Sequence, residues 1–498
     1  MSNFQASFQL ADNIDQDKVF LINLSDIDKR LDTDYYRPEL LTIEKRVSAK
    51  ATKKLQDFAN TMASGATPSV SESSYYADKE TGIPFLRVQN LTINGTLNLE
   101  NVKFISHHVH ENQIKRSQVS DSDLLIKITG VGRMAVASVP PKGFIGNTNQ
   151  HMVVLRTNDR EKSRYLANYL NLDVVEKLAS RRATGGTRPA LDYSALRSIP
   201  IIENIDFEDL EKAKQLSIEK KTEAQNLLNS IDDYLLTELD IKVPDIDNSL
   251  SNRMFTVQAS ELSGGRFDAY RNKVYFQELQ KVLENHTNGS VPLKKYTKNM
   301  ASGQWGVDEE DGYDRDIYTK CLVIRATEFD NNGNLSFDEN RIKYRLIENN
   351  KFKKMNILEH DLLIEKSGGS ENQPVGRIAI LTKNILNDYG NIAYSNFVQK
   401  ITVNSTAISP VFLFYYLKTL HNIKFTEKMQ SQTNGIRNLI TSEYLDTPII
   451  NVDCQKQHEI VQHIDQIRAT AAQLQQEANE ILAQAKQKIE RMILGEEN

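Results

Sequence analysis

The sequence predicts a mixed α/β protein with two copies of one core, each followed by a long helix, and with the two helices paired as an antiparallel coiled coil. Three observations predict it. Met62-Ala63-Ser64-Gly65 recurs 238 residues later as Met300-Ala301-Ser302-Gly303, each copy contains short strand and helix patterns, and each copy ends in a long helical period. We therefore expect a pseudo-twofold internal repeat of two domain-sized halves, about 20–245 and 255–498.

The register of this repeat is constant at first and then shifts. The offset of 238 carries Arg87 onto Arg325, Asn94-Gly95 onto Asn332-Gly333, and Asp123–Ile126 onto Asp361–Ile364. Further along, the second copy gains about six residues, and the alignment pairs Asn149 with Asn396 and Arg188 with Arg437. Repeats of a solenoid span about 20–50 residues. This repeat is much longer, which excludes a solenoid.

Six segments follow from the repeat. We expect an N-terminal extension (1–55), a first core (56–204), a first long helix (205–242), a linker with a repeated extension (243–288), a second core (289–450) and a second long helix (451–498). Proline and small polar residues after the first helix indicate the linker. The extensions predict a strand over Val19–Ile22, a helix over Glu39–Val47 and its counterpart over Tyr275–Leu283.

The first core is predicted to be rich in short strands. The apolar runs predict strands over Ile83–Val88, Leu124–Ile128, Gly132–Val139 and His151–Arg156. Asn94-Gly95 predicts a tight turn, because this pair suits the left-handed conformation of a hairpin. Apolar residues at helical spacing predict one helix over Arg164–Ala179.

The long helices have a narrow apolar seam. In the second, apolar residues alternate at spacings of four and three through Ile460, Ile464, Ile467, Ala471, Leu474, Ala478, Ile481 and Ala485. Such a seam is typical of a coiled coil and suits one partner helix. The first helix, about 207–239, is less regular and would extend roughly 50 Å at 1.5 Å per residue. The alternative is a pair of ordinary surface helices.

Composition restricts the cellular setting. Two cysteines in 498 residues favour a reducing compartment. The N-terminus lacks the pattern of a signal peptide, and no apolar run approaches the roughly 20 residues of a membrane span. We therefore expect a cytoplasmic protein. The net charge is −5, but residues 60–200 carry 17 Lys and Arg against 12 Asp and Glu, so a DNA partner remains compatible with the charge.

The sequence contains no recognisable catalytic motif. A phosphate-binding Gly-x-x-x-x-Gly-Lys segment, an Asn-Pro-Pro-Tyr methyltransferase segment and paired zinc ligands are missing. His107, His108 and His110 cluster at a spacing that favours a turn over a metal site. Asp361, Glu365 and Lys366 resemble nuclease residues, but the first copy keeps only the aspartate of this set. We therefore expect neither a catalytic nor a metal site in this chain.

The loops of both cores instead carry side chains that suit base edges. Asn and Gln can pair with adenine, and Arg with guanine or with phosphates. The residues expected to bind DNA are Thr67, Arg87, Gln89, Lys127, Thr129, Arg133, Asn147, Asn149, Gln150, Arg181, Arg182, Thr184 and Arg188 in the first core, and Gln304, Trp305, Arg325, Lys366, Ser370, Asn372, Gln373, Arg377, Asn396, Gln432, Asn434 and Arg437 in the second. Arg181 and Arg182 are expected in a basic loop. The alternative for each residue is an ordinary solvated loop.

The order of these motifs resembles a known family. Ser64-Gly65-Ala66-Thr67-Pro68-Ser69, Ile83–Val88, Asp123–Ile126 and a closing Ile199–Ile202 segment are followed by a long helix, and the whole arrangement occurs twice. In this it resembles the specificity (S) subunit of type I restriction–modification enzymes. The second copy departs from the pattern, because Gln304-Trp305 stands where the first has Ala66-Thr67 before a proline.

The resemblance implies that this chain and its partner subunits have separate roles in phage defence. Each core would be a target recognition domain that reads one half of a bipartite double-stranded DNA sequence, and the helices would set the gap between the halves. Two methyltransferase (modification) subunits would dock and would carry S-adenosylmethionine, and restriction subunits would bring ATP and Mg where they are present. This chain would hold no cofactor and do no chemistry. The alternatives are a recognition or scaffold subunit of another methyltransferase-based defence complex, and a stand-alone DNA-modifying enzyme.

Overall fold

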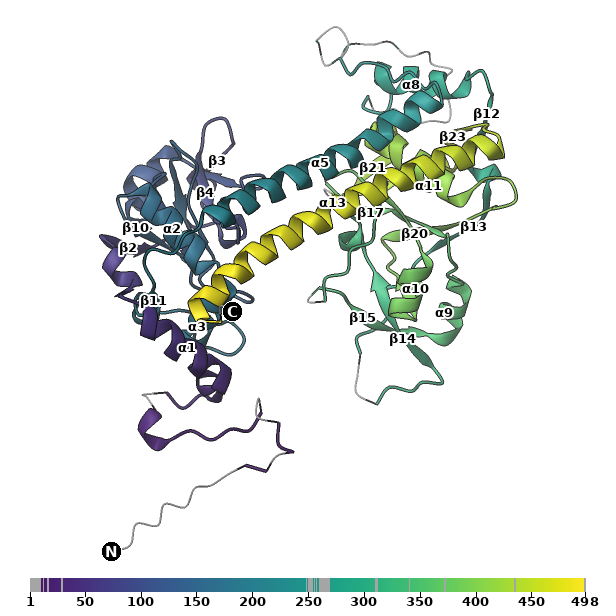
Figure 1. Ribbon diagram of the computed structural model, residues 1–498. Coiled ribbons are helices and arrows are strands. Elements are labelled where there is room, and N and C mark those ends of the chain that lie inside the picture. Colours follow the sequence, from purple (N-terminus) through teal and green to yellow (C-terminus); the bar gives the residue numbers. More distant parts are fainter. Residues whose placement is uncertain are drawn as a thin grey trace, which may run out of the picture. The chain divides into compact units, whose positions relative to one another are not determined.

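The computed structural model describes residues 10–496 except 12, 16–17, 28–29, 248, 250–253, 255, 257, 259–268, 310–311, 340, 371–372 and 434–435 (Figure 1). The chain divides into two compact units. Unit 1 is Met1–Lys220 with Gln476–Asn498, and unit 2 is Lys221–Gln475. Both units combine sheets with helices, so the mixed α/β prediction is confirmed.

Unit 1 is built around an antiparallel sheet of order β2-β10-β7-β8. Its strands are β2 (Thr61–Ser64), β10 (Met152–Arg156), β7 (Asp123–Lys127) and β8 (Ala137–Ser138). Alternate residues of a strand point to opposite faces. Leu124 and Ile126 join the core that contains the helices, whereas Leu125 joins a separate apolar cluster on the other face. Burial on both faces explains why β7 is apolar without alternation.

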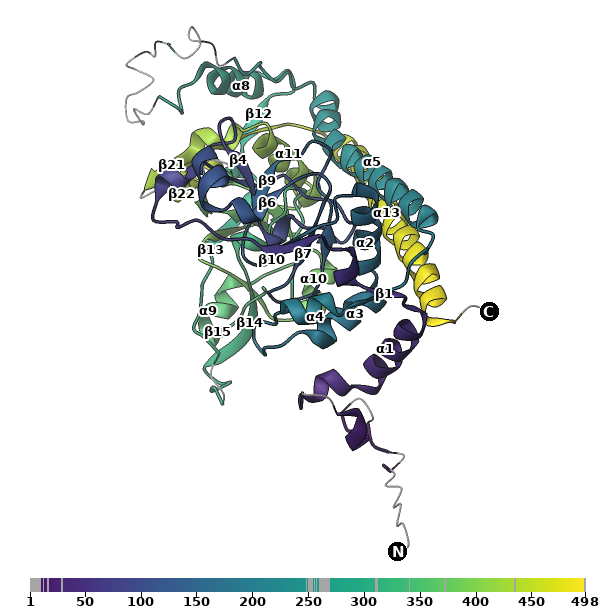
Figure 2. The same cartoon turned by 90° about the vertical axis from the view of Figure 1, so that its left-hand side faces the viewer.

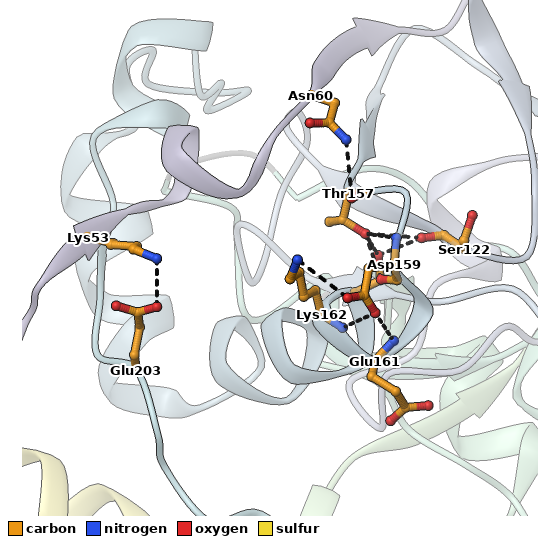
Figure 3. Close-up of polar contacts among 9 residues, drawn as sticks. Lys53, Asn60, Ser122, Thr157, Asp159, Glu161, Lys162 and Glu203 are labelled. Carbon is orange, nitrogen blue, oxygen red and sulfur yellow. Dashed lines mark hydrogen bonds and ion pairs between the residues drawn. The ribbon is translucent and has the colours of Figure 1, made fainter.

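Two further sheets complete unit 1. Five short strands form the order β3-β5-β4-β9-β6, namely β3 (Tyr76–Ala77), β5 (Lys103–Ile105), β4 (Ile83–Leu86), β9 (Gly146–Thr148) and β6 (Gln118–Val119). Strands β4 and β9 run parallel. The pair β1 (Lys53–Lys54) and β11 (Pro200–Ile201) joins the first and last strands of the core, and Lys53 forms an ion pair of 2.8 Å with Glu203 beside it (Figure 3).

The helices of unit 1 are α1 (Pro38–Lys50), α2 (Arg160–Leu170), α3 (Asp173–Arg182) and α4 (Tyr193–Arg197), with parts of α5 and α13. Helix α2 begins after Asp159, whose carboxylate accepts hydrogen bonds from the amides of Glu161 and Lys162 at 3.0 and 3.2 Å (Figure 3). Such an N-cap satisfies amides that have no partner within the helix. Helix α1 packs against α3, as Figure 2 shows.

Unit 2 has a sheet of the same order, β13-β20-β16-β18. Its strands are β13 (Thr297–Ser302), β20 (Val398–Val403), β16 (Leu362–Glu365) and β18 (Ile378–Ile380). The other sheets are β15-β14-β19, β17-β22-β21 and the pair β12-β23, made of β14 (Tyr318–Ile324), β15 (Tyr344–Glu348), β19 (Ile392–Tyr394), β17 (Ser367–Gly369), β21 (Gln430–Thr433), β22 (Ile436–Leu439), β12 (Ser290–Pro292) and β23 (Pro448–Ile450).

The helices of unit 2 are α8 (Val274–Glu284), α9 (Asn349–Met355), α10 (Lys383–Tyr389), α11 (Pro410–Asn422) and α12 (Thr441–Leu445), with the remaining parts of α5 and α13. Helix α9 lies beside β15 and β14 (Figure 1). Helix α11 is buried along most of its length, and Tyr416 donates a hydrogen bond of 3.0 Å to the carbonyl of Pro448. In unit 1, Tyr169 makes the same bond to Pro200, so both cores are closed in the same way.

The repeated Met-Ala-Ser-Gly segment has a structural cause. A Cβ on Gly65 would lie 2.1 Å from the carbonyl oxygen of Thr148, and one on Gly303 would lie 2.1 Å from that of Tyr394. Such distances are far below van der Waals contact, so only glycine fits where these backbones cross. The strongest sequence signal of the repeat therefore marks a packing requirement of the fold.

The long helices are continuous in the structure. Helix α5 spans Glu208–Glu238 and α13 spans Cys454–Leu494. Within unit 1, Asp209 pairs with Lys488 at 2.7 Å and Lys220 with Glu477 at 2.6 Å, so the two segments there run antiparallel. Within unit 2, Tyr234 stacks on His463 with ring centroids 4.2 Å apart, and further along α5 Glu238 pairs with Lys456 nearer the start of α13. The segments of unit 2 are therefore antiparallel as well.

Several predicted elements need correction. The helix over Arg164–Ala179 is two helices, because the chain breaks at Asn171-Leu172 between α2 and α3. The strand over Val19–Ile22 is wrong, since these residues have neither helix nor strand structure. The strand over Gly132–Val139 is reduced to β8, whereas α1 and α8 confirm the two extension helices. Asn94-Gly95 forms the predicted turn, with Gly95 at φ +84° and a bridge between Leu91 and Leu97.

Candidate nucleic-acid interface

Two of the arginines predicted to bind DNA in unit 1 are internal. Arg181 and Arg182 belong to the last turn of α3 and both form ion pairs with Glu44 of α1, at 3.0 and 2.6 Å. Arg181 also donates to the carbonyl of Tyr35 at 2.6 Å and is only 8% exposed. The prediction of a basic loop here is therefore wrong, because these guanidinium groups anchor the N-terminal extension to the core.

Other predicted contacts of unit 1 have internal partners as well. Arg133 pairs with Asp173 at 2.5 Å, and Asn147 is fully buried and donates to Ile114 and Ser117 at 3.0 and 3.1 Å. Lys127 is 7% exposed and donates to the carbonyl of Val131 at 2.7 Å; burial lowers the pKa of its ammonium group. Arg87 donates to Asn101 at 3.2 Å. Lys127 and Asn147 are therefore corrected to structural roles, whereas Arg87 and Arg133 are half-buried and stay predictions.

A smaller set of unit 1 remains at the surface. Thr67 donates to the side chain of Gln150, and Arg188 lies 3.2 Å from Nε2 of His151. Thr67, Gln150 and Arg188 are exposed. The pKa of His151 is lowered, first by burial and then by Arg188, so a neutral imidazole beside the guanidinium is favoured. His151 was not among the predicted contacts.

The remaining predicted residues of unit 1 are near this set along the chain. Asn149 is 8% exposed and accepts the amide of His151 at 3.2 Å, so it shapes the loop that carries Gln150. Thr129 and Thr184 each bridge to Ala190, next to the segment of Arg188. Gln89 is exposed after β4. The surface candidates of unit 1 are thus concentrated in three loops, around Thr67, Gln150 and Arg188.

In unit 2, two predicted arginines again have partners within the unit. Arg325 pairs with Glu328 at 2.5 Å and donates to Arg341 at 2.7 Å. Arg377 is 9% exposed, pairs with Glu365 at 2.8 Å and donates to the carbonyl of Phe329 at 2.7 Å. Arg377 is therefore corrected to a structural role, whereas Arg325 is half-buried and stays a prediction.

The surface candidates of unit 2 are mostly amides and apolar groups. Gln304, Trp305, Ser370, Gln373, Asn396 and Gln432 are exposed, while Lys366 and Arg437 are half-buried. Asn372 and Asn434 lie outside the described residues. The guanidinium of Arg345 stacks 4.7 Å from the ring centroid of Trp305. Phe397 and Ile436, which were not predicted, are 46% and 47% exposed. They stand next to the predicted residues Asn396 and Arg437 in the sequence.

Backbone hydrogen bonds give the register between the two cores directly. The amide of Asn149 donates to Leu86 at 3.1 Å, and that of Ser395 donates to Ile324 at 2.8 Å. The residue that corresponds to Asn149 is therefore Ser395, and Gln150 corresponds to Asn396. The pairing of Asn149 with Asn396 is corrected by one residue, because polar side chains were matched in place of backbone positions.

The nuclease-like residues of the second core are held in ion pairs. Asp361 binds Lys400 at 2.8 Å with both side chains almost fully buried, and Glu365 binds Arg377. The carboxylate of Asp361 also accepts a hydrogen bond of 2.9 Å from the amide of Leu358. In the first core, the carboxylate of Asp123 accepts the equivalent bond of 2.8 Å from the amide of Ser120. The shared aspartate thus closes the turn before the apolar part of a strand. Among the residues that the structure describes, no group of three or more His, Cys, Asp or Glu could hold a metal ion.

Each core is fastened to its long helix by a similar polar cluster. In unit 1, Lys214 of α5 is buried, pairs with Glu211 at 3.1 Å and binds the side chain of Asn168. In unit 2, Arg468 of α13 donates to the carbonyl of Asn332 at 3.2 Å and to the side chain of Asn334, both in the Asn-Gly turn. Within each unit the helix is therefore joined to the core by specific hydrogen bonds in addition to apolar packing.

Known proteins offer a further comparison. A family profile described as the type I restriction modification DNA specificity domain matches residues 48–218. No curated protein matches. None of the helices in the described part of the chain has the length and apolar character needed to cross a membrane.

Solved structures that are similar to this chain include the following three. One is the S subunit of a type I restriction-modification system from M. genitalium, with 14% identity and a TM-score of 0.34 over 89% of this chain and 95% of that one. Another is the HsdS subunit from Thermoanaerobacter tengcongensis, with 14% identity and a TM-score of 0.28 over 89% and 94%. The third comes from work on complex assembly and conformational transition of the type I R-M system, with 15% identity and a TM-score of 0.37 over 89% and 95%. Residues 48–218 of this chain thus match the family of type I restriction modification DNA specificity domains.

Proposed function

We propose that this chain is the DNA specificity subunit of a type I restriction–modification complex. Each core reads one half of a bipartite target, and the long helices set the gap between the halves. Two methyltransferase subunits bind to the chain and bring S-adenosylmethionine, and restriction subunits bring ATP and Mg where the system contains them. The chain itself selects the sequence and performs no reaction.

The observation that carries the proposal is the specificity domain at residues 48–218, together with the second unit that shares its central sheet order. A chain with two similar but chemically different cores suits a target with two different halves. The central four-stranded sheets have the same strand order, whereas the exposed side chains differ: Thr67, Gln150 and Arg188 in unit 1 have no identical counterparts in unit 2. The cores thus share a scaffold and differ where a base would be read.

The surface chemistry supports DNA as the ligand. The amide side chains of Gln150, Gln304 and Asn396 in loops and of Gln432 in β21 are exposed, and such groups can pair with adenine in the major groove. Most of the arginines in these cores form hydrogen bonds or ion pairs within their own unit. The phosphate contacts that dominate affinity would then come in part from the modification subunits.

The test is base-resolution mapping of methylated adenine in cells that contain this chain with its modification subunits and no other adenine methyltransferase. We expect one asymmetric, bipartite motif with a constant gap. Exchange of residues 56–204 for the matching segment of a related chain should change one half of the motif and leave the other half intact. A palindromic or continuous motif, or a change in both halves, would contradict the proposal.

A further inference from the structure

The two cores differ in surface chemistry at one matched pair of positions. In unit 1, the amide of Ile128 donates to the carbonyl of His151 at 3.0 Å, and the amide of Leu191 donates to that of Ile128 at 2.8 Å. In unit 2, the amide of Lys366 donates to the carbonyl of Phe397, and that of Leu439 to Lys366, both at 2.8 Å. Phe397 therefore occupies the position of His151.

The counterpart of Arg188 follows from the same set of backbone hydrogen bonds. Ala190 bridges to Thr129, and Asn438 pairs with Ser367, which lies one residue after Lys366 as Thr129 does after Ile128. Two residues before Ala190 stands Arg188, and two residues before Asn438 stands Ile436. Ile436 therefore occupies the position of Arg188. The pairing of Arg188 with Arg437 that the sequence indicated is off by one residue.

The chemistry at these positions is opposite in the two cores. Arg188 and His151 form a polar contact of 3.2 Å at the surface of unit 1. Phe397 and Ile436 expose 46% and 47% of their surface in unit 2. Both segments are hydrogen-bonded to the backbone of Lys366 and Ser367, where β17 begins, so the two apolar residues lie on segments that flank the same stretch of chain. Apolar side chains exposed near one another are candidates for contact with a partner.

The surroundings of this apolar pair favour DNA as the partner. Lys366 lies between the two segments, and Arg437 directly follows Ile436. Trp305, which corresponds to Thr67 two residues after the repeated glycine, is 38% exposed and carries the guanidinium of Arg345 over its ring. Cations next to apolar groups can hold phosphates while the apolar groups face the bases.

The groove and the base follow from the comparison. Arg reads guanine through O6 and N7 in the major groove, and corresponding positions of two matched cores should face the same groove. In that groove the one apolar feature of a base pair is the 5-methyl group of thymine. We propose that Phe397 and Ile436 contact thymine methyl groups in the second half-site, whereas Arg188, oriented by His151, reads guanine in the first. This inference rests on the proposed function.

The experiment uses the complex with its modification subunits and a duplex that carries the mapped motif. Each thymine of the second half-site is replaced in turn by deoxyuridine, which lacks only the methyl group. At one or two positions we expect binding to weaken about 3- to 10-fold, the range for loss of a buried methyl contact. In Phe397→Ala or Ile436→Ala, thymine and deoxyuridine at those positions should bind equally.

A control variant separates this effect from a general loss of stability. Leu358 is 48% exposed in unit 2, and Leu358→Ala should keep the preference for thymine. In the first half-site, Arg188→Ala should relax the requirement for guanine at one position while leaving the deoxyuridine effect in the second half-site. Trp305 is the single tryptophan of the chain, so its emission reports whether unit 2 of each variant is folded.

Three outcomes would overturn the inference while leaving the proposed function intact. The first is a bipartite motif whose second half contains no thymine on either strand. The second is equal binding of thymine and deoxyuridine at every position of that half. The third is loss of modification subunits from the Phe397→Ala and Ile436→Ala complexes, which would identify the apolar pair as a protein interface. A motif that is not bipartite would instead refute the proposed function itself.

Discussion

The carboxylate of Glu44 in α1 accepts a hydrogen bond of 3.0 Å from the guanidinium of Arg181 in α3, which lies 137 positions later in the sequence. Arg182 binds the other carboxylate oxygen at 2.6 Å. Although burial opposes ionisation, Arg182 and Arg181 hold the pKa of Glu44 below its ordinary value. The N-terminal extension is thus attached to the first core by a partly buried network of charges.

This network predicts a marked effect of Glu44→Gln. Removing one partner of a buried ion pair leaves the other charge unsatisfied, so we expect the free energy of unfolding of unit 1 to fall by about 2–4 kcal/mol. Hydrogen exchange of the amides in α1 and α3 measures the loss. The matched control is Glu39→Gln on the same helix, where Glu39 and Lys177 are both exposed, and where we expect less than about 1 kcal/mol. Equal effects of the two variants would contradict a special role of Glu44.

The same network has a predicted pH dependence. Because the pKa of Glu44 is lowered in the folded state, the unfolded chain takes up its proton first as the pH falls. The stabilisation is therefore complete above the unfolded pKa, about 4.3, and is lost progressively below it. The difference in exchange rates between wild type and Glu44→Gln should shrink as the pH drops below that value. A difference that grows in acid would reverse the assigned sign.

A second charged pair lies in the interior of unit 2. Lys400 and Asp361 are 1% and 2% exposed and lie 2.8 Å apart. We expect Lys400→Met and Asp361→Asn each to destabilise unit 2 by about 3–5 kcal/mol, because each leaves one buried group without its partner. The double variant should lose at least about 1 kcal/mol less than the sum, since the unpaired charge is then removed. Urea unfolding followed by Trp305 emission measures all three, and strict additivity would rule out the coupling.

His421 gives unit 2 a separate response to acid. Its Nδ1 lies 2.8 Å from the hydroxyl of Thr426, and burial, followed by the nearby Arg377 and Lys418, lowers its pKa to about 4. The unfolded chain, with a histidine pKa of about 6.5, binds a proton between these values that the folded chain does not. Above about pH 6.5 this group should therefore leave the free energy of unfolding unchanged. Between about pH 6.5 and pH 5 it should lower the free energy of unfolding by about 2 kcal/mol.

The variant His421→Gln tests this assignment. Glutamine can still bond to Thr426 but does not titrate, so the change in the urea midpoint of Trp305 emission between pH 7 and 5 should be smaller than in wild type. His458 is exposed on α13, and His458→Gln should retain the response of wild type. If both variants respond as wild type does, another group is responsible for the acid sensitivity.

These contacts show why sequence reasoning found the scaffold more readily than the site. The constant offset, the apolar strand at Asp123–Ile126 and the Asn94-Gly95 turn depend on local pattern, and the structure contains them. The role of Arg181 could not be predicted, because the partner that neutralises it comes from a distant segment. A basic residue near a glycine-rich segment looks the same in sequence whether it faces DNA or a buried glutamate.

The apolar part of the candidate site was missed for a different reason. Base recognition was sought mainly among polar and charged side chains such as Asn, Gln and Arg, so Phe397 and Ile436 were not predicted as contacts. One signal was present in the sequence: the second copy replaces Thr67 with Trp305, a large aromatic residue just after the close glycine crossing. Backbone hydrogen bonds were needed to show that His151 and Arg188 correspond to the two apolar residues in the repeat.

The last prediction concerns the long helices. If they set the gap between half-sites, insertion of seven residues in both, after Lys220 in α5 and after Gln475 in α13, should lengthen the gap. Seven residues add about 10 Å, or roughly three base pairs, and return the apolar seam nearly to its original face. We expect methylation mapping to show unchanged half-sequences separated by about three more unspecified bases.

A two-residue insertion at the same places is the matched control. At 3.6 residues per turn it rotates the following part of each helix by about 200°, which turns seam residues such as Ala478 away from the partner helix. Ala478 is fully buried in the structure. We therefore expect this variant to lose specific methylation, although it is shorter and closer to wild type in length. A seven-residue variant that keeps the original gap would mean that the cores are positioned by the modification subunits, and that the helices only connect them.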